Sequence, residues 1–370
     1  GRNVGPWLTA FAYGTSYFSA VVFVGYAGQF GWKYGLASTW IGLGNAFLGS
    51  LLAWVVLGRR TKVMTQHLRS KTMPDFFGER YDSRALKLAA SAIVFIFLVP
   101  YTASIYNGLS RLFEMAFHVP YTWCVIAMAV FTGIYVILGG YMATAINDFI
   151  QGIIMLGGIV AVVWAVLSGQ GGFLEAIGKM AQIPSDVEIT LGQPGAFTSF
   201  FGPDPLNLLG VVILTSLGTW GLPQMIGKFY AIRDEKSINT GTVISTIFAV
   251  VISGGCYFLG GFARLFDNAA IYDESGNVVF DSIIPYMLSS LSDVLIGIVV
   301  VLVLSASMST LASLVLTSSS TLTLDFLKGN VLKHADDRKL VRTMQVLIVF
   351  FITVSVVLAI KPPTFIAQLM

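Results

Sequence analysis

The chain has 370 residues, of which 55% are hydrophobic and only 11% are charged. A soluble domain carries about 25% charged residues, so 22 Lys and Arg with 19 Asp and Glu are too few for a soluble protein of this size. This composition argues against a soluble enzyme and a disordered scaffold, and the net charge of +3 gives no reason to expect nucleic acid as a partner.

Nine stretches of at least 18 residues contain no Asp, Glu, Lys or Arg. In chain order they are 3–32, 34–58, 88–110, 115–147, 149–174, 205–227, 237–263, 294–324 and 343–360. A transmembrane helix needs about 20 mostly apolar residues, and none of the stretches has the period of two that a membrane β-barrel requires. We therefore predict an all-α polytopic membrane protein with nine complete spans and the beginning of a tenth at Pro362.

The loops between these stretches differ in positive charge. Arg2 and the loops 59–87, 228–236 and 328–342 hold 17 of the 22 Lys and Arg, whereas the loops on the other side hold five. Cytoplasmic loops carry the excess of Lys and Arg in membrane proteins. We therefore expect these three loops to be cytoplasmic, in a multi-pass protein of the plasma membrane.

The two ends of the chain both lie close to apolar segments. No signal peptide precedes the first stretch, and the chain stops at Met370 a few residues into another apolar segment. We expect a single transmembrane domain over 1–370 that is a fragment of a longer protein. A natural nine-span protein is the alternative.

The first and sixth stretches contain the strongest interruptions of a helical pattern. In the first, Gly14 is followed by Thr15 and Ser16 about a third of the way along. In the sixth, two glycines and a proline lie within six residues, at Gly218, Gly221 and Pro223. Such residues break helices, and broken helices in the membrane are tolerated where they line a cavity.

These two interruptions are five spans apart, so the two helices cross the membrane in opposite senses. That arrangement predicts two inverted five-helix repeats, about 5–168 and about 203–370, the second of them incomplete. Transporters bind substrates and ions at such breaks, near the middle of the membrane. A packing role is the alternative for any single Gly or Pro.

The eighth stretch is rich in hydroxyl groups, with eleven Ser and Thr between 305 and 323. Ser309 and Thr310 are adjacent, and their hydroxyls, together with carbonyls freed at the break near Gly14, could surround a monovalent cation. Hydroxyls that bond their own helix or line a helix–helix contact are the alternative.

Five segments of the chain resemble the sodium:solute symporter family. They are Gly1–Trp7, Thr72–Tyr81, Gly139–Gly152, Trp220–Gln224 and Ser305–Thr310. In that order they are similar to the loop before the first core helix, a cytoplasmic loop, a glycine-, aspartate- and glutamine-containing signature, the broken sixth core helix and the eighth core helix. The resemblance runs from residue 1 to about 360 and implies the leucine-transporter fold. The family's extra helix before the core and its tenth core helix are absent from this chain, which supports the fragment interpretation.

The resemblance also implies a sodium site between the first and eighth helices. Its ligands would be the carbonyls of Thr15, Phe18 and Ala306 and the hydroxyls of Ser309 and Thr310. Asp148 corresponds to the family's acidic residue on the inward sodium path, and a partly hydrated position at the cytoplasmic end of its helix is the alternative. One departure is Tyr17, which stands where the proline transporters of the family have an aspartate and which supplies no carboxylate.

The substrate is expected between the two breaks. The candidate contacts are Ser19, Val21, Tyr106, Ser216, Thr219, Trp220 and Gln224. Each of these side chains could serve packing alone. Because no Lys or Arg lies in mid-span near the breaks, a substrate carboxylate would rest on the N-terminus of a half-helix. A small amino acid such as proline, or a small monocarboxylate, fits this site.

We therefore predict a sodium-coupled secondary symporter that imports a small organic solute by alternating access and is not an enzyme. Its partners would be the solute, sodium and the lipid bilayer, with no cofactor apart from sodium as the coupling ion. The chain has no Walker-type ATP-binding motif. A transporter-like domain that senses a solute, and a proton-coupled transporter or exchanger on the same fold, are the alternatives.

Overall fold

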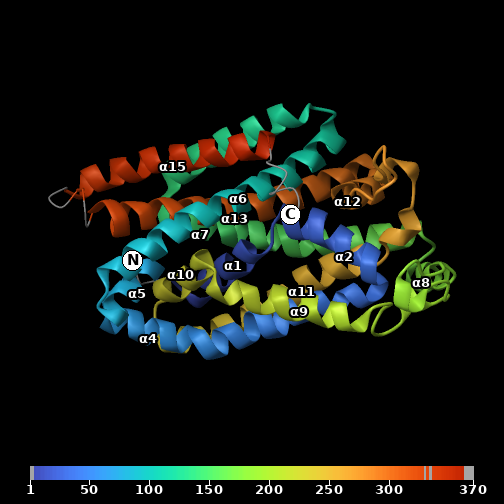
Figure 1. Ribbon diagram of the computed structural model, residues 1–370, viewed down its shortest axis with the longest axis horizontal. Helices are drawn as coiled ribbons and strands as arrows, with labels where there is room; N and C mark the ends of the chain where they lie inside the picture. Colours follow the sequence, from blue (N-terminus) through green and yellow to red (C-terminus); the bar gives the residue numbers. More distant parts are fainter. Residues whose placement is uncertain (1–3, 329–330, 333–335, 362–370) are drawn as a thin grey trace.

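A computed structural model describes residues 4–328, 331–332 and 336–361, apart from the side chains of 140–142. Over these residues the chain is helical and contains no strand, and its long helices run roughly alongside one another (Figure 1). By length and composition, seven of the described helices could cross a membrane, or eight if one bent pair counts as a single span. The number of nine spans stays a prediction, and the expected tenth at Pro362 lies outside the described residues.

The first two expected spans pack against the same helix, α11 (Glu235–Gly260), in opposite directions. They comprise α1 (Pro6–Tyr17), η1 (Val21–Tyr26), α2 (Ala27–Tyr34), η2 (Gly35–Ser38), α3 (Thr39–Gly44), η3 (Asn45–Leu51), η4 (Trp54–Gly58) and α4 (Arg59–His67). The chain reverses at Gly35, whose φ of 59° is readily adopted by glycine. In the first span, Gly14 faces Phe248 and Gly31 faces Gly260, so this span runs parallel to α11. After the reversal, Gly42 faces Ser253 and Gly58 faces Ile238, so the second span runs antiparallel to it.

A short helix α5 (Met73–Tyr81) leads into α6 (Arg84–Phe117) and then into α7 (Tyr121–Gly169). Helix α7 bends back on itself. The side-chain amide of Asn147 donates to the hydroxyl of Tyr135 at 2.9 Å, although twelve residues of straight helix would separate them by about 18 Å. The segments Tyr121–Gly139 and Ala143–Gly169 are accordingly two candidate spans.

A peripheral segment follows, with α8 (Phe173–Ala181), η5 (Glu188–Thr190) and η6 (Ala196–Thr198). The sixth expected span is α9 (Pro205–Gly218), η7 (Thr219–Gly221) and α10 (Pro223–Ala231), and its two halves meet at 53°. The break lies where the sequence predicts it, because α9 ends at Gly218 and Pro223 begins the next helix.

The remaining elements complete the helical bundle. They are α11 (Glu235–Gly260), η8 (Ala263–Phe266), η9 (Ala269–Ile271), α12 (Phe280–Ser289), α13 (Asp293–Thr321), η10 (Leu322–Leu327) and α15 (Asp337–Ile360). Helix α13 packs against α7, α6 and α1, and most of its residues from Val299 to Thr321 are buried. Helix α13 therefore lies in the interior, where its hydroxyl groups face other helices rather than lipid.

The break in the first span is not at Gly14, as expected, but after Tyr17. Helix α1 continues through Gly14, and a methyl group there would lie 2.4 Å from the ring of Phe248. Gly14 thus allows α1 to approach α11 closely. The helix ends instead at Phe18, which is extended, with φ of −106° and ψ of 127°.

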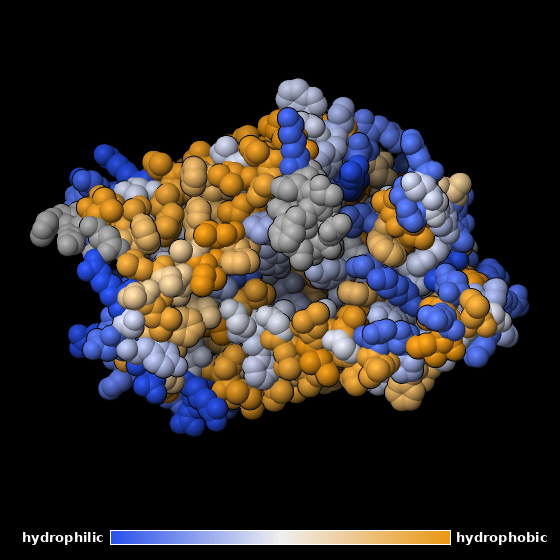
Figure 2. Space-filling model, in the orientation of Figure 1, coloured by the Kyte–Doolittle hydropathy of each residue, from blue (hydrophilic) through white to orange (hydrophobic). Residues whose placement is uncertain are grey.

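The surface agrees with a position in the membrane. Hydrophobic side chains form a broad middle zone, hydrophilic ones gather at the two ends of the long axis, and the face in view is hollowed near its middle (Figure 2). Many large apolar side chains on α6, α7, α9 and α15 are exposed, which is expected when lipid rather than water surrounds them.

Candidate functional site

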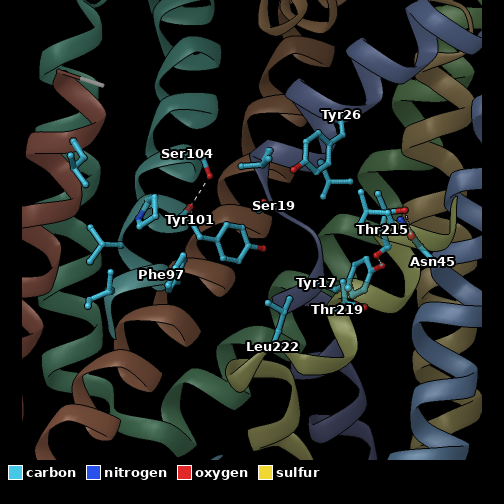
Figure 3. A pocket seen from close by; sticks show the side chains of 18 of the residues that line it. Tyr17, Ser19, Tyr26, Asn45, Phe97, Tyr101, Ser104, Thr215, Thr219 and Leu222 are labelled. Carbon is cyan, nitrogen blue, oxygen red and sulfur yellow. Dashed lines mark hydrogen bonds between the residues drawn. The ribbon is translucent and has the colours of Figure 1, made fainter. Parts of the chain in front are cut away.

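The break in the first span turns backbone oxygens towards α13. Thr15 and Ser16 hydroxyls bond carbonyls one turn earlier in α1, at 2.9 and 2.6 Å, and the chain then becomes extended at Phe18. The extended segment carries Ser19 and separates α1 from the π-helical turn η1 (Figure 3). The carbonyls of Thr15 and Phe18 consequently face a hydroxyl of the neighbouring helix.

That hydroxyl belongs to Thr310. Its Oγ1 lies 3.1 Å from the Thr15 oxygen, 3.1 Å from the Phe18 oxygen and 3.0 Å from the Ala306 oxygen. A hydroxyl has one proton to donate, so Thr310 can satisfy only one of these three carbonyls at a time, and the Ala306 carbonyl also accepts the helical N–H of Thr310. Such a surplus of uncharged oxygens in a buried position is suited to a hard cation.

Ser309 completes the set predicted from the sequence. Its Oγ lies 2.8 Å from Thr15 Oγ1 and donates to Asp148 Oδ1 at 2.6 Å. Thr15, Phe18, Ala306, Ser309 and Thr310 are all buried and meet where α1 ends against α13. The structure therefore brings together the five expected sodium ligands, while their binding of sodium stays a prediction.

Asp148 and Lys228 are placed differently from what the sequence suggested. Asp148 is fully buried, so the partly hydrated position considered for it is wrong. Lys228, counted among the cytoplasmic loop residues, is 5% exposed on α10, and its Nζ lies 3.7 Å from Asp148 Oδ2. The expectation that no Lys or Arg lies near the breaks is also wrong, because Pro223 starts α10 early enough to carry Lys228 into the bundle.

A cavity of about 860 Å³ lies on the other side of the first break. Residues from both broken spans and from α6 line it, and none of the described lining residues is charged. Figure 3 shows Ser19, Tyr26 and Tyr101 at one part of this space, with Tyr17, Asn45 and Thr219 at another. Ser19 Oγ is buried and makes no hydrogen bond within the described protein, so it is available to a ligand.

Three of the seven candidate substrate contacts line this cavity, namely Ser19, Val21 and Thr219. The other four do not. Tyr106 is buried elsewhere on α6, and Ser216 donates to Asn45 Oδ1 at 3.2 Å. Trp220 donates to the carbonyl of Leu48 at 2.9 Å.

The seventh candidate, Gln224, lines a second cavity of about 260 Å³. Thr72, Lys228, Ser313 and Thr317 also line that space. It therefore lies on the loop side of the break in the sixth span and not in the 860 Å³ cavity.

Several lining residues were not predicted. They include Tyr17, Tyr26, Asn45, Tyr101, Ser104, Thr215, Leu222 and Tyr257. Four of them, Asn45, Tyr101, Ser104 and Tyr257, lie on spans without a break, so a search for interruptions does not find them. The other four lie on the two broken spans, where the rotation of each half-helix decides which side chains face the cavity. Tyr17 directly precedes the first break, and its hydroxyl donates to the carbonyl of Thr215 at 3.1 Å, which joins the two broken spans across the cavity.

The profile of the sodium:solute symporter family matches residues 1–370. The chain belongs to the sodium:solute symporter family. The sodium/proline symporters of Salmonella typhimurium and Escherichia coli are each 27% identical to it, over 98% of this chain and 71% of theirs. The osmoregulated proline transporter OpuE of Bacillus subtilis is 27% identical over the whole chain and 73% of its own length.

Solved structures confirm the fold expected for this symporter. A sodium-coupled sialic acid symporter superposes with a TM-score of 0.79 at 16% identity, covering 97% of this chain and 73% of that one. The nucleobase–cation symporter Mhp1 superposes with a TM-score of 0.61 at 13% identity, over all of this chain and 75% of that one. The all-α, leucine-transporter-like fold is thus confirmed. The family match and the curated relatives confirm sodium-coupled solute symport as the function of this membrane protein.

Proposed function

We propose that this symporter imports a small zwitterionic or monocarboxylic solute, such as proline, with sodium bound between α1 and α13. The observation that carries the proposal is the oxygen cage around Thr310 Oγ1, which shares the first break with the 860 Å³ cavity. An ion at Thr15 and Phe18 would hold the extended segment in place, and the next residue, Ser19, faces the cavity. Sodium binding would therefore pre-organise the solute site.

The chemistry of the cavity supports this class of solute. No described lining residue carries a charge, so a substrate with a net charge of two or more would be uncompensated. A single carboxylate could bind at the start of η1, where the unpaired Ser19 hydroxyl lies at the positive end of the helix, while the amides of Ala20, Val22 and Phe23 already donate to Ser307 Oγ and to the Ser19 carbonyl. Tyr26, Tyr101 and Tyr257 would cover the apolar body of the solute. The curated relatives named for proline agree with a solute of this size.

The energy of one sodium ion is sufficient for such transport. One positive charge moving through about 100 mV releases about 2.3 kcal/mol. A tenfold sodium gradient adds about 1.4 kcal/mol. Together these could hold about a 500-fold gradient of a neutral solute at one-to-one coupling, since each 1.4 kcal/mol is a factor of ten. We therefore propose no cofactor apart from the coupling ion.

The proposal is tested by thermal unfolding of the purified chain with amino acids and monocarboxylates, in sodium chloride and in choline chloride. We expect proline or a related small solute to raise the unfolding temperature much more in sodium than in choline. Uptake of that solute into proteoliposomes should then require an inward sodium gradient. Equal stabilisation in both salts, followed by uptake that ignores sodium, would favour a proton-coupled transporter or an exchanger.

We also propose that the loops 59–87, 228–236 and 328–342 face the cytoplasm at the plasma membrane, on the basis of their positive charge. Both native cysteines, Cys124 and Cys256, are buried, so a single introduced cysteine reports its own side of the membrane. Arg80→Cys should react with an impermeant thiol reagent only after permeabilisation, and Glu188→Cys should react in intact cells. The reverse pattern would invert the topology.

A further inference from the structure

The ion pair between Asp148 and Lys228 lies in the interior of the bundle. Lys228 is 5% exposed and Asp148 is 0% exposed, and Nζ lies 3.7 Å from Oδ2. Moving two charges out of water costs several kcal/mol per ion, and the attraction within a buried pair often only offsets that cost. A buried ion pair is therefore weak evidence that the pair stabilises the fold. Its role must instead be sought in what lies next to it.

The pair adjoins the expected sodium ligands. Asp148 Oδ1 accepts from the Ser309 hydroxyl, while the other carboxylate oxygen faces the Lys228 ammonium. One oxygen of this carboxylate therefore contacts a sodium-site hydroxyl, and its other oxygen faces an ammonium group. A sodium ion and Lys228 would lie on opposite sides of one negative charge.

Two stacked pairs of hydroxyls reinforce this arrangement. Ser309 lies 2.8 Å from the hydroxyl of Thr15, and one turn further along α13, Ser313 lies 2.8 Å from the hydroxyl of Ser16. The Lys228 ammonium donates to Ser313 at 3.2 Å. The lysine thus contacts Ser313 in the second pair, one helical turn from Ser309, which is an expected sodium ligand.

We propose that Lys228 is a tethered cation that sets the affinity of the sodium site. Its ammonium compensates Asp148 when sodium is absent and repels sodium when the ion is bound. The carboxylate would otherwise hold a cation tightly in this low-dielectric interior, whereas a transporter must release its ion. This inference rests on the proposed sodium site and adds a residue that controls affinity without being a ligand.

The second cavity gives this role a physical route. It measures about 260 Å³ and is lined by Lys228, Ser313, Thr317 and Ser320, with Lys71 and Thr72 from the loop before α5. Sodium that left towards these loops would pass the ammonium, which stays attached to α10. After the ion has left, the Lys228 ammonium would still compensate the charge of Asp148. The protein without sodium would therefore carry no uncompensated carboxylate at this place.

The test is a titration of the purified full chain with sodium in the absence of solute. Binding is monitored by the unfolding temperature or by tryptophan fluorescence, and choline keeps the ionic strength constant. Lys228→Met should bind sodium at least about tenfold more tightly, a change of about 1.4 kcal/mol. Lys228→Arg, which retains the charge, should stay within about threefold of the wild type. Asp148→Asn should bind sodium at least about tenfold more weakly.

The double variant Asp148→Asn with Lys228→Met separates an electrostatic role from a structural one. It removes both charges, so its sodium affinity should exceed that of Asp148→Asn alone and return towards the wild type. A merely structural role would weaken sodium binding in each single variant and again in the double variant. The comparison of Asp148→Asn with the double variant also decides the matter if Lys228→Met alone fails to fold.

The outcomes are distinguishable from failure of the proposed function. If the wild type binds no sodium, the sodium site itself is wrong. If the wild type binds sodium, but removing the lysine leaves the affinity unchanged or weakens it in both backgrounds, the tethered cation is overturned. Tighter binding in both backgrounds, with the arginine variant unchanged, supports it.

Discussion

Removing one oxygen from the cage tests the sodium site most sharply, and Thr310→Val does so with little change in volume. The hydroxyl lies within 3.0–3.1 Å of the carbonyls of Thr15, Phe18 and Ala306, and Thr310 is fully buried. A contact between a polar group and a charge contributes about 1.5–3 kcal/mol. Because 1.4 kcal/mol is a factor of ten, we expect sodium affinity to fall by about 10- to 150-fold.

The assay is the sodium concentration that gives half-maximal uptake of solute into proteoliposomes, together with the sodium-dependent rise in unfolding temperature. Ser309→Ala combined with Thr310→Ala should abolish the sodium dependence. Thr323→Val is the matched control, because Thr323 is 1% exposed in η10 and its hydroxyl donates only to its own helix, to the Ser319 carbonyl at 2.7 Å. Unchanged sodium affinity in Thr310→Val would refute the cage as the ion site.

Three further changes test the fold and the cavity. Gly31→Ala would place a methyl group 1.9 Å from a backbone oxygen of α11, and we expect it to lower the free energy of unfolding by about 1–3 kcal/mol or more. Gly254→Ala is the control, because a methyl group there meets open space and should not lower the stability. Arg264→Lys loses a two-pronged contact with Asp186 (3.0 and 2.7 Å) and the stacking of the guanidinium on Trp32 and Phe197. We expect the free energy of unfolding to fall by about 1–3 kcal/mol, with a weaker salt dependence of unfolding. Tyr101→Phe should weaken solute binding by about two- to tenfold without changing sodium affinity, and equal loss of both would place Tyr101 outside the solute site.

The sequence predicts the break in the sixth span more accurately than the break in the first. Pro223 cannot continue a helix from Gly218, so the chemistry of the backbone determines where α9 ends. Gly14 only permits an interruption, and here its missing side chain serves the contact with Phe248 instead. The break at Phe18 depends on tertiary contacts with α13, which no local pattern of residues reveals.

The ion site was easier to predict than the solute site for a related reason. Ser309 and Thr310 are adjacent on one helix, and their hydroxyl groups can be recognised from the residue types alone. The cavity lining depends instead on how each helix is rotated, so Tyr101 faces it while Tyr106, on the same helix, does not. Lys228 was missed because the charges after it resemble a loop, although α10 extends to Ala231.

Equilibrium binding of radioactive sodium to the purified full chain tests the central claim most directly. The account predicts saturable binding by the wild type, displaced by unlabelled sodium and not by choline, and no saturable binding by the double variant Ser309→Ala with Thr310→Ala. Saturable binding of undiminished affinity in that double variant would contradict the account, because the ion would then occupy a different place in the protein.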